Sequence, residues 1–193
     1  MEYDADKREI KLGRKLSKLD ELVVKFIGVI EKHADYVIMS GYVSILLGRS
    51  RATEDVDLFV RKMPFERFTG LYADLERNGF WCLNAEKPED IYSFLKDGLA
   101  VRFSLKGETI PNFEMKFPKR DLDRETFDDF ITVNLPGSRI KISSLERQIA
   151  FKRYYLGSDK DIEDALHIEE VFKGKLDYGK IDKLKEAIKN ISD

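Results

Sequence analysis

The feature that most constrains this chain is residues 36–61, with the sequence YVIMSGYVSILLGRSRATEDVDLFVR. An apolar run ends at Ser40 and Gly41, an apolar stretch of helical character follows, and a second apolar run contains Asp55 and Asp57. Side chains alternate between the two faces of a strand, so a strand here would project both aspartates from one face. Two such carboxylates repel each other, and their pairing favours a site that holds a hard divalent cation.

The Ser40/Gly41 pair predicts a tight turn between a strand and the start of a helix. Backbone N–H groups at such a turn point to the position where an anion binds. An isolated D-x-D favours the solvent-facing side of an exposed strand, but this one lies among Val56, Leu58 and Phe59, downstream of the turn. A phosphate-binding turn followed by a paired-carboxylate metal site suggests nucleotide chemistry.

The segment resembles the nucleotidyltransferases of the DNA polymerase β superfamily, whose signature is a small-residue pair, a short helix and a strand with D-x-D. Residues 51–58 (RATEDVDL) are most similar to AbiEii, the branch of nucleotidyltransferase toxins, where R-x-[ST]-x-D-h-D-h is usual and h is apolar. The small pair of that family is usually Gly-Gly or Gly-Ser. This chain instead has Ser40, Gly41 and then bulky Tyr42, a departure that bears on nucleotide affinity.

The resemblance implies a Mg²⁺-dependent enzyme, with two ions, that transfers NMP from an NTP to a hydroxyl acceptor. Asp55 and Asp57 would bind metal. A third carboxylate on a neighbouring strand would hold the second metal and draw the proton from the acceptor, and Glu114 in Phe-Glu-Met-Lys is the candidate. The alternative for Glu114 is an ordinary strand residue paired with Arg102 or Lys116.

A second resemblance lies in Lys152 and the later K-D-x-x-D that starts at Lys160 and Asp161. AbiEii-type proteins place these residues on helices after the core, facing the nucleotide. On this resemblance both lysines, with the Ser40/Gly41 turn, would hold the triphosphate, and Asp161 would orient the acceptor or act as a supplementary base. Alternatively, Asp161 only favours a helix N-terminus and Lys152 is a surface residue.

Two residues before the D-x-D complete the candidate nucleotide site. Arg51 would contact phosphate, and Thr53 would hydrogen-bond the turn that aims the aspartates. Either residue can equally belong to an ordinary loop. His33 and His167 have no partners at metal-ligand spacing and receive no role.

The periodicity of the whole chain predicts an α/β (α+β) fold, a mixed β-sheet core with helices packed on it. Residues 1–135 would form the nucleotidyltransferase core with its N-terminal helix, and residues 136–193 a small C-terminal helical subdomain, with the turn at Pro136 and Gly137 as the boundary. Alternation over residues 101–105 and 113–117 predicts a hairpin. Helices are predicted over residues 17–30, 64–79, 143–155 and 159–172, and around residues 181–188.

Composition excludes several function classes. A formal charge of −2 argues against a protein that coats nucleic acid by bulk electrostatics. Local basic clusters at residues 7–18 and 116–124 would contact RNA or belong to solvated surface. The single Cys82 cannot form an intramolecular disulfide, and no Cys/His spacing resembles a zinc site. No membrane-spanning segment or signal peptide is expected, so we expect a cytoplasmic protein.

The acceptor stays open at this point. By analogy with the toxin branch it would be the 3′ end of a tRNA, or else a protein side chain, and an antitoxin would be a partner. An aminoglycoside-like small molecule is the enzymatic alternative, favoured by a closed acidic pocket, whereas a basic surface beside the cleft favours RNA. The third possibility is a degenerate domain that binds a nucleotide or partner without transfer, which predicts that Glu114 lies far from the aspartates.

Overall fold

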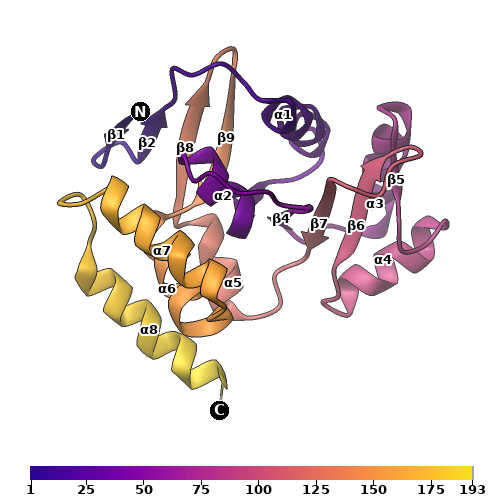
Figure 1. Ribbon diagram of the computed structural model, residues 1–193. Coiled ribbons are helices and arrows are strands. Elements are labelled where there is room, and N and C mark those ends of the chain that lie inside the picture. Colours follow the sequence, from indigo (N-terminus) through magenta and orange to yellow (C-terminus); the bar gives the residue numbers. More distant parts are fainter. Residues whose placement is uncertain (193) are drawn as a thin grey trace.

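The computed structural model describes residues 1–192, and this part of the chain contains one nine-stranded mixed sheet with helices packed around it (Figure 1). The strand order is β1-β2-β8-β9-β3-β4-β7-β6-β5. In chain order the strands are β1 (Glu2–Asp4), β2 (Glu9–Lys11), β3 (Tyr36–Met39), β4 (Asp55–Val60), β5 (Phe80–Cys82), β6 (Val101–Leu105), β7 (Asn112–Lys116), β8 (Phe130–Leu135) and β9 (Ser138–Ser143). The mixed α/β fold predicted from the sequence is confirmed.

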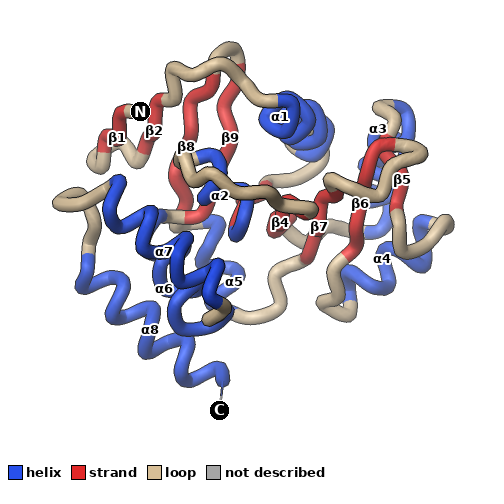
Figure 2. The backbone as a smooth tube through the Cα atoms, viewed as in Figure 1, coloured by secondary structure: helices blue, strands red, loops and turns tan. Residues whose placement is uncertain are grey.

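Two groups of helices lie on either side of the molecule; Figure 2 draws all helices in blue and the strands in red. Helices α6, α7 and α8 lie together near the C-terminus, and α3 and α4 lie at the β5 edge (Figure 1). Their bounds are α1 (Lys18–Ile30), α2 (Ser40–Leu46), α3 (Phe65–Arg77), α4 (Pro88–Lys96), α5 (Asp121–Arg124), the 3₁₀-helix η1 (Glu125–Phe127), α6 (Leu145–Phe151), the π-helix η2 (Lys152–Leu156), α7 (Asp159–Val171) and α8 (Tyr178–Ser192).

The centre of the sheet brings β3, β4 and β7 together. Strand β4 pairs antiparallel with β3 and parallel with β7. The register places Asp57 opposite Met39 on one side and opposite Glu114 on the other. The β6–β7 hairpin predicted from the sequence is confirmed. The parallel β4–β7 pairing is what sets Glu114 beside Asp57.

One face of the sheet carries the aromatic core. Phe26 on α1 stacks on Phe113 of β7 with ring centroids 3.9 Å apart, and Phe80 meets both rings edge-on. All three rings are almost wholly buried. Because this face is closed by packing, polar side chains of β4 and β7 are left on the opposite face, where the C-terminal helices approach.

The sheet extends further along the chain than the sequence predicts. Strand β9 lies inside the sheet between β8 and β3, so the sheet continues to Ser143 rather than ending at residue 135. Pro136 and Gly137 form the turn of the β8–β9 hairpin, with Gly137 at a φ of 74°. A hairpin turn and an interdomain turn have the same composition, so the sequence predicts a domain boundary at this hairpin turn. Helices follow from Leu145 onwards.

The basic N-terminal segment is ordered as a hairpin on the edge of the sheet. Strand β2 pairs with β8, and the Arg8 guanidinium pairs with Asp129. The Arg14 guanidinium lies 2.6 Å from the buried carboxylate of Asp20. Two of the segment's cations therefore serve the fold. Within residues 1–192, no helix has both the length and the apolar character needed to cross a membrane.

Candidate functional site

The predicted turn at Ser40 and Gly41 joins β3 directly to α2. Ser40 has a φ of 61°, a left-handed conformation that few non-glycine residues adopt. Tyr42, the bulky departure from the family pattern, is fully buried, and its hydroxyl donates to Asp20 Oδ1 at 2.8 Å. Its side chain therefore belongs to the core and is tied to Asp20 of α1.

Gly41 is approached closely by two side chains. A Cβ at this position would collide with Arg51 Nη2 and would lie 3.2 Å from Thr53 Oγ1. Arg51 and Thr53 were predicted to belong to the site, and the structure brings both to the turn. The loop before β4 and the turn after β3 thus form one packed unit.

The two aspartates lie on one face of β4, as the alternation predicted. Asp55, Asp57 and Phe59 are half-buried while the residues between them are buried. Thr53 Oγ1 donates to the Asp55 backbone carbonyl at 3.0 Å and to its carboxylate at 3.2 Å, which orients that side chain. Burial raises the pKa of Asp57 to about 6, and the negative charges of Asp55 and Glu114 add to the rise. The site therefore favours positive charge beside Asp57.

Glu114 lies next to Asp57 in the parallel β4–β7 pairing. Its Oε1 is 2.6 Å from the Lys116 ammonium and its Oε2 is 3.0 Å from Arg102 Nη2. Burial raises the pKa of Glu114, but these two cations outweigh burial and hold it below the ordinary value. Both partners named as the ordinary alternative are thus present, together with the proximity that a catalytic role requires.

No group of three or more His, Cys, Asp or Glu side chains within residues 1–192 has the geometry of a metal site. The carboxylates available to a cation are Asp55 and Asp57, since Glu114 is engaged by Lys116 and Arg102. Mg²⁺ is commonly held by one or two carboxylates with substrate phosphates and water completing its shell. The donor set fits such a partly open site.

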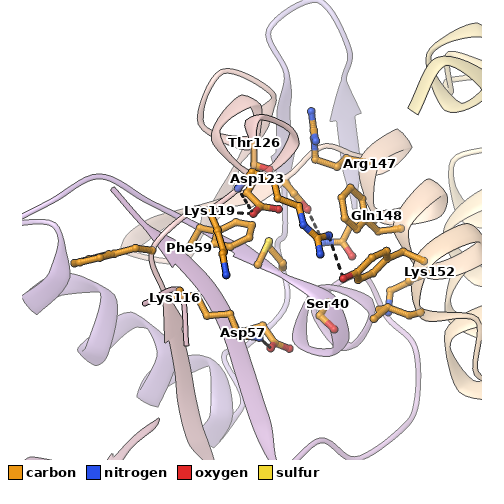
Figure 3. A pocket seen from close by; sticks show the side chains of 18 residues that line it. Ser40, Asp57, Phe59, Lys116, Lys119, Asp123, Thr126, Arg147, Gln148 and Lys152 are labelled. Atoms are coloured by element: carbon orange, nitrogen blue, oxygen red, sulfur yellow. Dashed lines mark hydrogen bonds and ion pairs between the residues drawn. The ribbon is translucent and has the colours of Figure 1, made fainter. Parts of the chain in front are cut away.

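A cavity of about 340 Å³ opens in front of Asp57, between the sheet and the C-terminal helices. Figure 3 shows Asp57, Lys116 and Lys119 on one side of it and Gln148 and Lys152 on the other, with Ser40 between them. Its charged lining is mostly positive: Lys116, Lys119, Arg120, Arg147 and Lys152, against Asp57 and Asp123. A cationic cavity beside paired carboxylates suits a phosphorylated ligand with a bound metal.

Lys152 reaches this cavity from η2, yet it is only 1 % exposed. Its ammonium lies 2.8 Å from Asp164 Oδ2, on α7. Asp164 is fully buried and also pairs with Arg49 at 2.7 Å and with Arg51 at 3.2 Å. One carboxylate therefore holds three cations from two distant parts of the chain, and it connects α7 to the arginine that packs on Gly41.

Asp161 and Lys160 occupy different surroundings. Asp161 is buried at the start of α7, where it accepts a hydrogen bond from Ser158 and lies 3.7 Å from the Lys152 ammonium. Lys160 is exposed and is not among the residues that line the cavity. Of the predicted nucleotide-binding set, the structure brings together the Ser40/Gly41 turn, its two neighbours before β4, and Lys152, but not Lys160.

Sequence reasoning did not assign several residues that belong to this site. Lys119 and Arg120 were noted only as part of a basic cluster, although they line the cavity. Asp164 closes the K-D-x-x-D motif, which was the available signal for it. Tyr155 gave no signal, because its place at the cavity depends on the π-helical turn of η2.

Comparisons with known proteins identify the fold. No family model matches the chain, and no curated protein sequence matches it. Among solved structures, an antigenic nucleotidyltransferase-like protein from Paracoccidioides brasiliensis is 23% identical, with 89% of this chain and 86% of that chain covered and a TM-score of 0.53.

Two structures of the antibiotic-resistance factor ANT(2″)-Ia are also similar. The solution structure has a TM-score of 0.57 at 17% identity and covers 89% of this chain and 91% of that one. The crystal structure with adenylyl-2″-tobramycin has a TM-score of 0.53 at 15% identity and covers 92% of this chain and 100% of that one. The chain therefore has a nucleotidyltransferase-like fold.

Proposed function

We propose that this protein is a Mg²⁺-dependent nucleotidyltransferase that moves NMP from an NTP to a hydroxyl acceptor. The observation that carries the proposal is the register of β4 and β7, which sets Glu114 beside Asp57 at the edge of a cationic cavity shared with Ser40. A degenerate binding domain predicts the opposite, a distant Glu114. The nucleotidyltransferase-like fold neighbours support the same function.

Asp55 and Asp57 would hold Mg²⁺, with Glu114 joining them for a second ion once Lys116 has left it. Bound metal would neutralise charge on the phosphates and draw the acceptor oxygen toward the α-phosphorus. The Ser40/Gly41 turn would bind phosphate oxygens through its backbone amides, and Arg51 would keep that turn in place.

The chain's own groups account for the proton. The acceptor hydroxyl oxygen bonds to the α-phosphorus, the bond from that phosphorus to the bridging oxygen breaks, and pyrophosphate leaves. Lys116 and Arg102 hold the pKa of Glu114 below its ordinary value despite burial, so the residue is a charged carboxylate, the form that can accept a proton. Glu114 would then take the hydroxyl proton.

The positive charge of the cavity lining bears on which class of acceptor the protein would use. We favour an RNA 3′ end, as in a tRNA, or a protein side chain, because an aminoglycoside is a polycation and five cationic side chains line the cavity. The small-molecule alternative rests on the fold likeness to ANT(2″)-Ia. In this proposal Lys152 supports the phosphate side of the cavity and Asp161 would orient the acceptor from α7, whereas the exposed Lys160, which does not line the cavity, has no role.

The test is label transfer. We would incubate the purified protein with Mg²⁺, a nuclease-inhibited cell extract and each α-labelled NTP in turn. The Asp55→Asn/Asp57→Asn double variant is treated in the same way as the control. Label that needs the aspartates and is lost to RNase identifies an RNA acceptor, and label lost only to protease identifies a protein. Label on a tobramycin-type compound alone would establish the small-molecule function. Transfer to none of these, with no NTP raising the melting temperature, would overturn the proposal.

The resemblance of residues 51–58 to the AbiEii pattern supports a toxin role within this function, with an antitoxin as partner. A toxin of this kind acts on cytoplasmic targets, so induced expression in a bacterial host should arrest growth. The Asp57→Asn variant should not. Equal growth of both strains at equal protein levels would remove the toxin role while leaving the transferase activity open to the label-transfer test.

A further inference from the structure

The cations that line the cavity are not equivalent, because most of them already have a carboxylate partner. Lys116 pairs with Glu114 and Lys152 with Asp164. Arg147 is buried, lies 3.4 Å from Asp129 and donates to the Leu122 carbonyl at 2.9 Å. These three charges are compensated within the protein and serve the fold as much as a ligand.

Lys119 and Arg120 differ from them. Within residues 1–192 neither side chain forms an ion pair with a carboxylate, although both line the cavity. The nearby Asp123 carboxylate accepts from their backbone amides, at 3.2 Å and 2.9 Å. It holds the loop in shape and adds the one negative charge on this wall. The side-chain charges of Lys119 and Arg120 therefore face the cavity, and the nearby Asp123 carboxylate is hydrogen-bonded to their backbone amides rather than to their side chains.

The structure also orients both side chains. The Lys119 stem packs on Gly98, where an added Cβ would lie 2.8 Å from Lys119 Cδ. Figure 3 shows Lys119 directed over the space in front of Asp57 and Lys116. Arg120 lies over the ring of Tyr155, with its guanidinium carbon 5.5 Å from the ring centroid, and Arg120 Nη1 donates to the Tyr155 hydroxyl at 3.1 Å. A neutral hydroxyl is a weak partner for a guanidinium and is readily exchanged for an anion.

We infer that Lys119 and Arg120 are the residues that bind the polyphosphate of the nucleotide, and that Arg120 exchanges Tyr155 for a phosphate oxygen when it does so. This inference rests on the proposed function and changes which cationic residues bind the triphosphate. The buried Lys152 holds the site together, and the exposed Lys160 does not take part. Guanidinium groups suit this task because two of their N–H groups meet two phosphate oxygens at once. Lys119, as a compact charge, would cover the remaining oxygens.

The experiment measures binding of inorganic tripolyphosphate in EDTA by calorimetry, so that neither a base nor a metal contributes. Lys119→Gln and Arg120→Gln should each weaken binding about tenfold or more, since each removes a charge-assisted contact. Lys160→Gln and Arg77→Gln remove the same charges outside the cavity and should bind as the wild type does. Melting temperatures report whether each variant is folded.

A further variant separates binding from support of the loop. Tyr155→Phe keeps the ring and removes the hydroxyl, so it should bind tripolyphosphate as well as the wild type or more tightly. If it weakens binding as much as Arg120→Gln does, Arg120 acts through Tyr155 and the inference is wrong.

Two other outcomes overturn the inference in distinguishable ways. If Lys119→Gln and Arg120→Gln bind like the wild type while label transfer still needs Asp57, only the phosphate assignment fails. If wild-type protein binds neither tripolyphosphate nor any NTP with Mg²⁺ and transfers no label, the proposed function fails with it.

Discussion

The Lys116 ammonium lies 2.6 Å from Glu114 Oε1, its neighbour two residues back on the same face of β7. The same ammonium is 4.0 Å from Asp57 Oδ1. A cation carried by the protein thus stands between the two carboxylates that the proposed reaction would use. It reduces their mutual repulsion and competes with any divalent ion for the same oxygens.

Lys116→Met should therefore strengthen binding of Mn²⁺ in the absence of nucleotide. The lysine is about one-third exposed, and a pair of this kind contributes about 1 kcal/mol, which corresponds to roughly fivefold in affinity. Electron paramagnetic resonance of free Mn²⁺ during a titration measures this directly. Lys106→Met, in the turn after β6, is the matched control and should change nothing. Unchanged or weaker binding by Lys116→Met would show that the ammonium does not compete with the metal.

The raised pKa of Asp57 makes the stability of the metal-free protein depend on pH. The folded-state pKa of about 6 exceeds the ordinary value of 3.8 for a free aspartate carboxyl. Between these values the native state holds a proton that the unfolded state has lost, so stability falls as pH rises toward 6. Asp57→Asn should be more stable than the wild type at pH 8, by up to about 3 kcal/mol. The difference should shrink at pH 4.5.

Urea unfolding in EDTA at both pH values tests this prediction. Asp55→Asn provides a comparison on the same face of β4. If Asp57→Asn unfolds the protein or lowers its stability at pH 8, the carboxylate supports the fold and is misassigned as a metal ligand.

Asp164 is expected to be essential for the fold near the site. Its carboxylate is fully buried among Arg49, Arg51 and Lys152. Removing one partner of a buried ion pair leaves charge uncompensated and costs about 3–5 kcal/mol. Asp164→Asn should lower the free energy of unfolding by an amount of this order, as measured in urea. Glu163→Gln, which removes only the exposed partner of Arg49, should have little effect. Similar stability of both variants would contradict the role assigned to Asp164.

Gly41→Ala should damage the phosphate-binding turn. The added methyl group would displace the Arg51 guanidinium from the turn and from its pairing with Asp164. We expect tripolyphosphate binding to weaken at least tenfold in a protein that still folds. Gly28→Ala, on α1, is the control, because nothing lies within 4 Å of its added Cβ. Alanine there should stabilise the helix slightly. Normal ligand binding by Gly41→Ala would show that the turn does not need its close contact with Arg51.

The parts of the site that were predictable are those set by local chemistry. Alternation along β4 placed Asp55 and Asp57 on one face, and the composition of residues 40 and 41 indicated the turn. Alternation also identified Glu114 as a polar residue of a hairpin. That Glu114 would lie beside Asp57 was implied by the family resemblance and not by the residues, because alternation says nothing about which strands pair with each other.

The parts that were not predictable depend on distant partners. Lys152 is buried because Asp164 meets it on another helix, and a sequence that shows it beside Arg153 suggests a surface residue instead. Lys119 and Arg120 stand in a basic cluster typical of solvated surface, and only the approach of the C-terminal helices turns part of that cluster into a cavity wall. Strand β9 was missed because its turn resembles a linker.

The late position of β9 has a consequence for how the chain is made. Strand β3 pairs with β9 on one side, so its edge has no partner until residues 138–143 have been synthesised. An open edge inside an apolar sheet invites pairing with other chains. A nascent chain that has reached the β8–β9 turn therefore holds all three acidic residues and an unprotected strand. We expect chains truncated before Ser138 to aggregate. The pairing of Asp57 with Glu114 therefore depends on β9, a strand that contributes no acidic residue to the site.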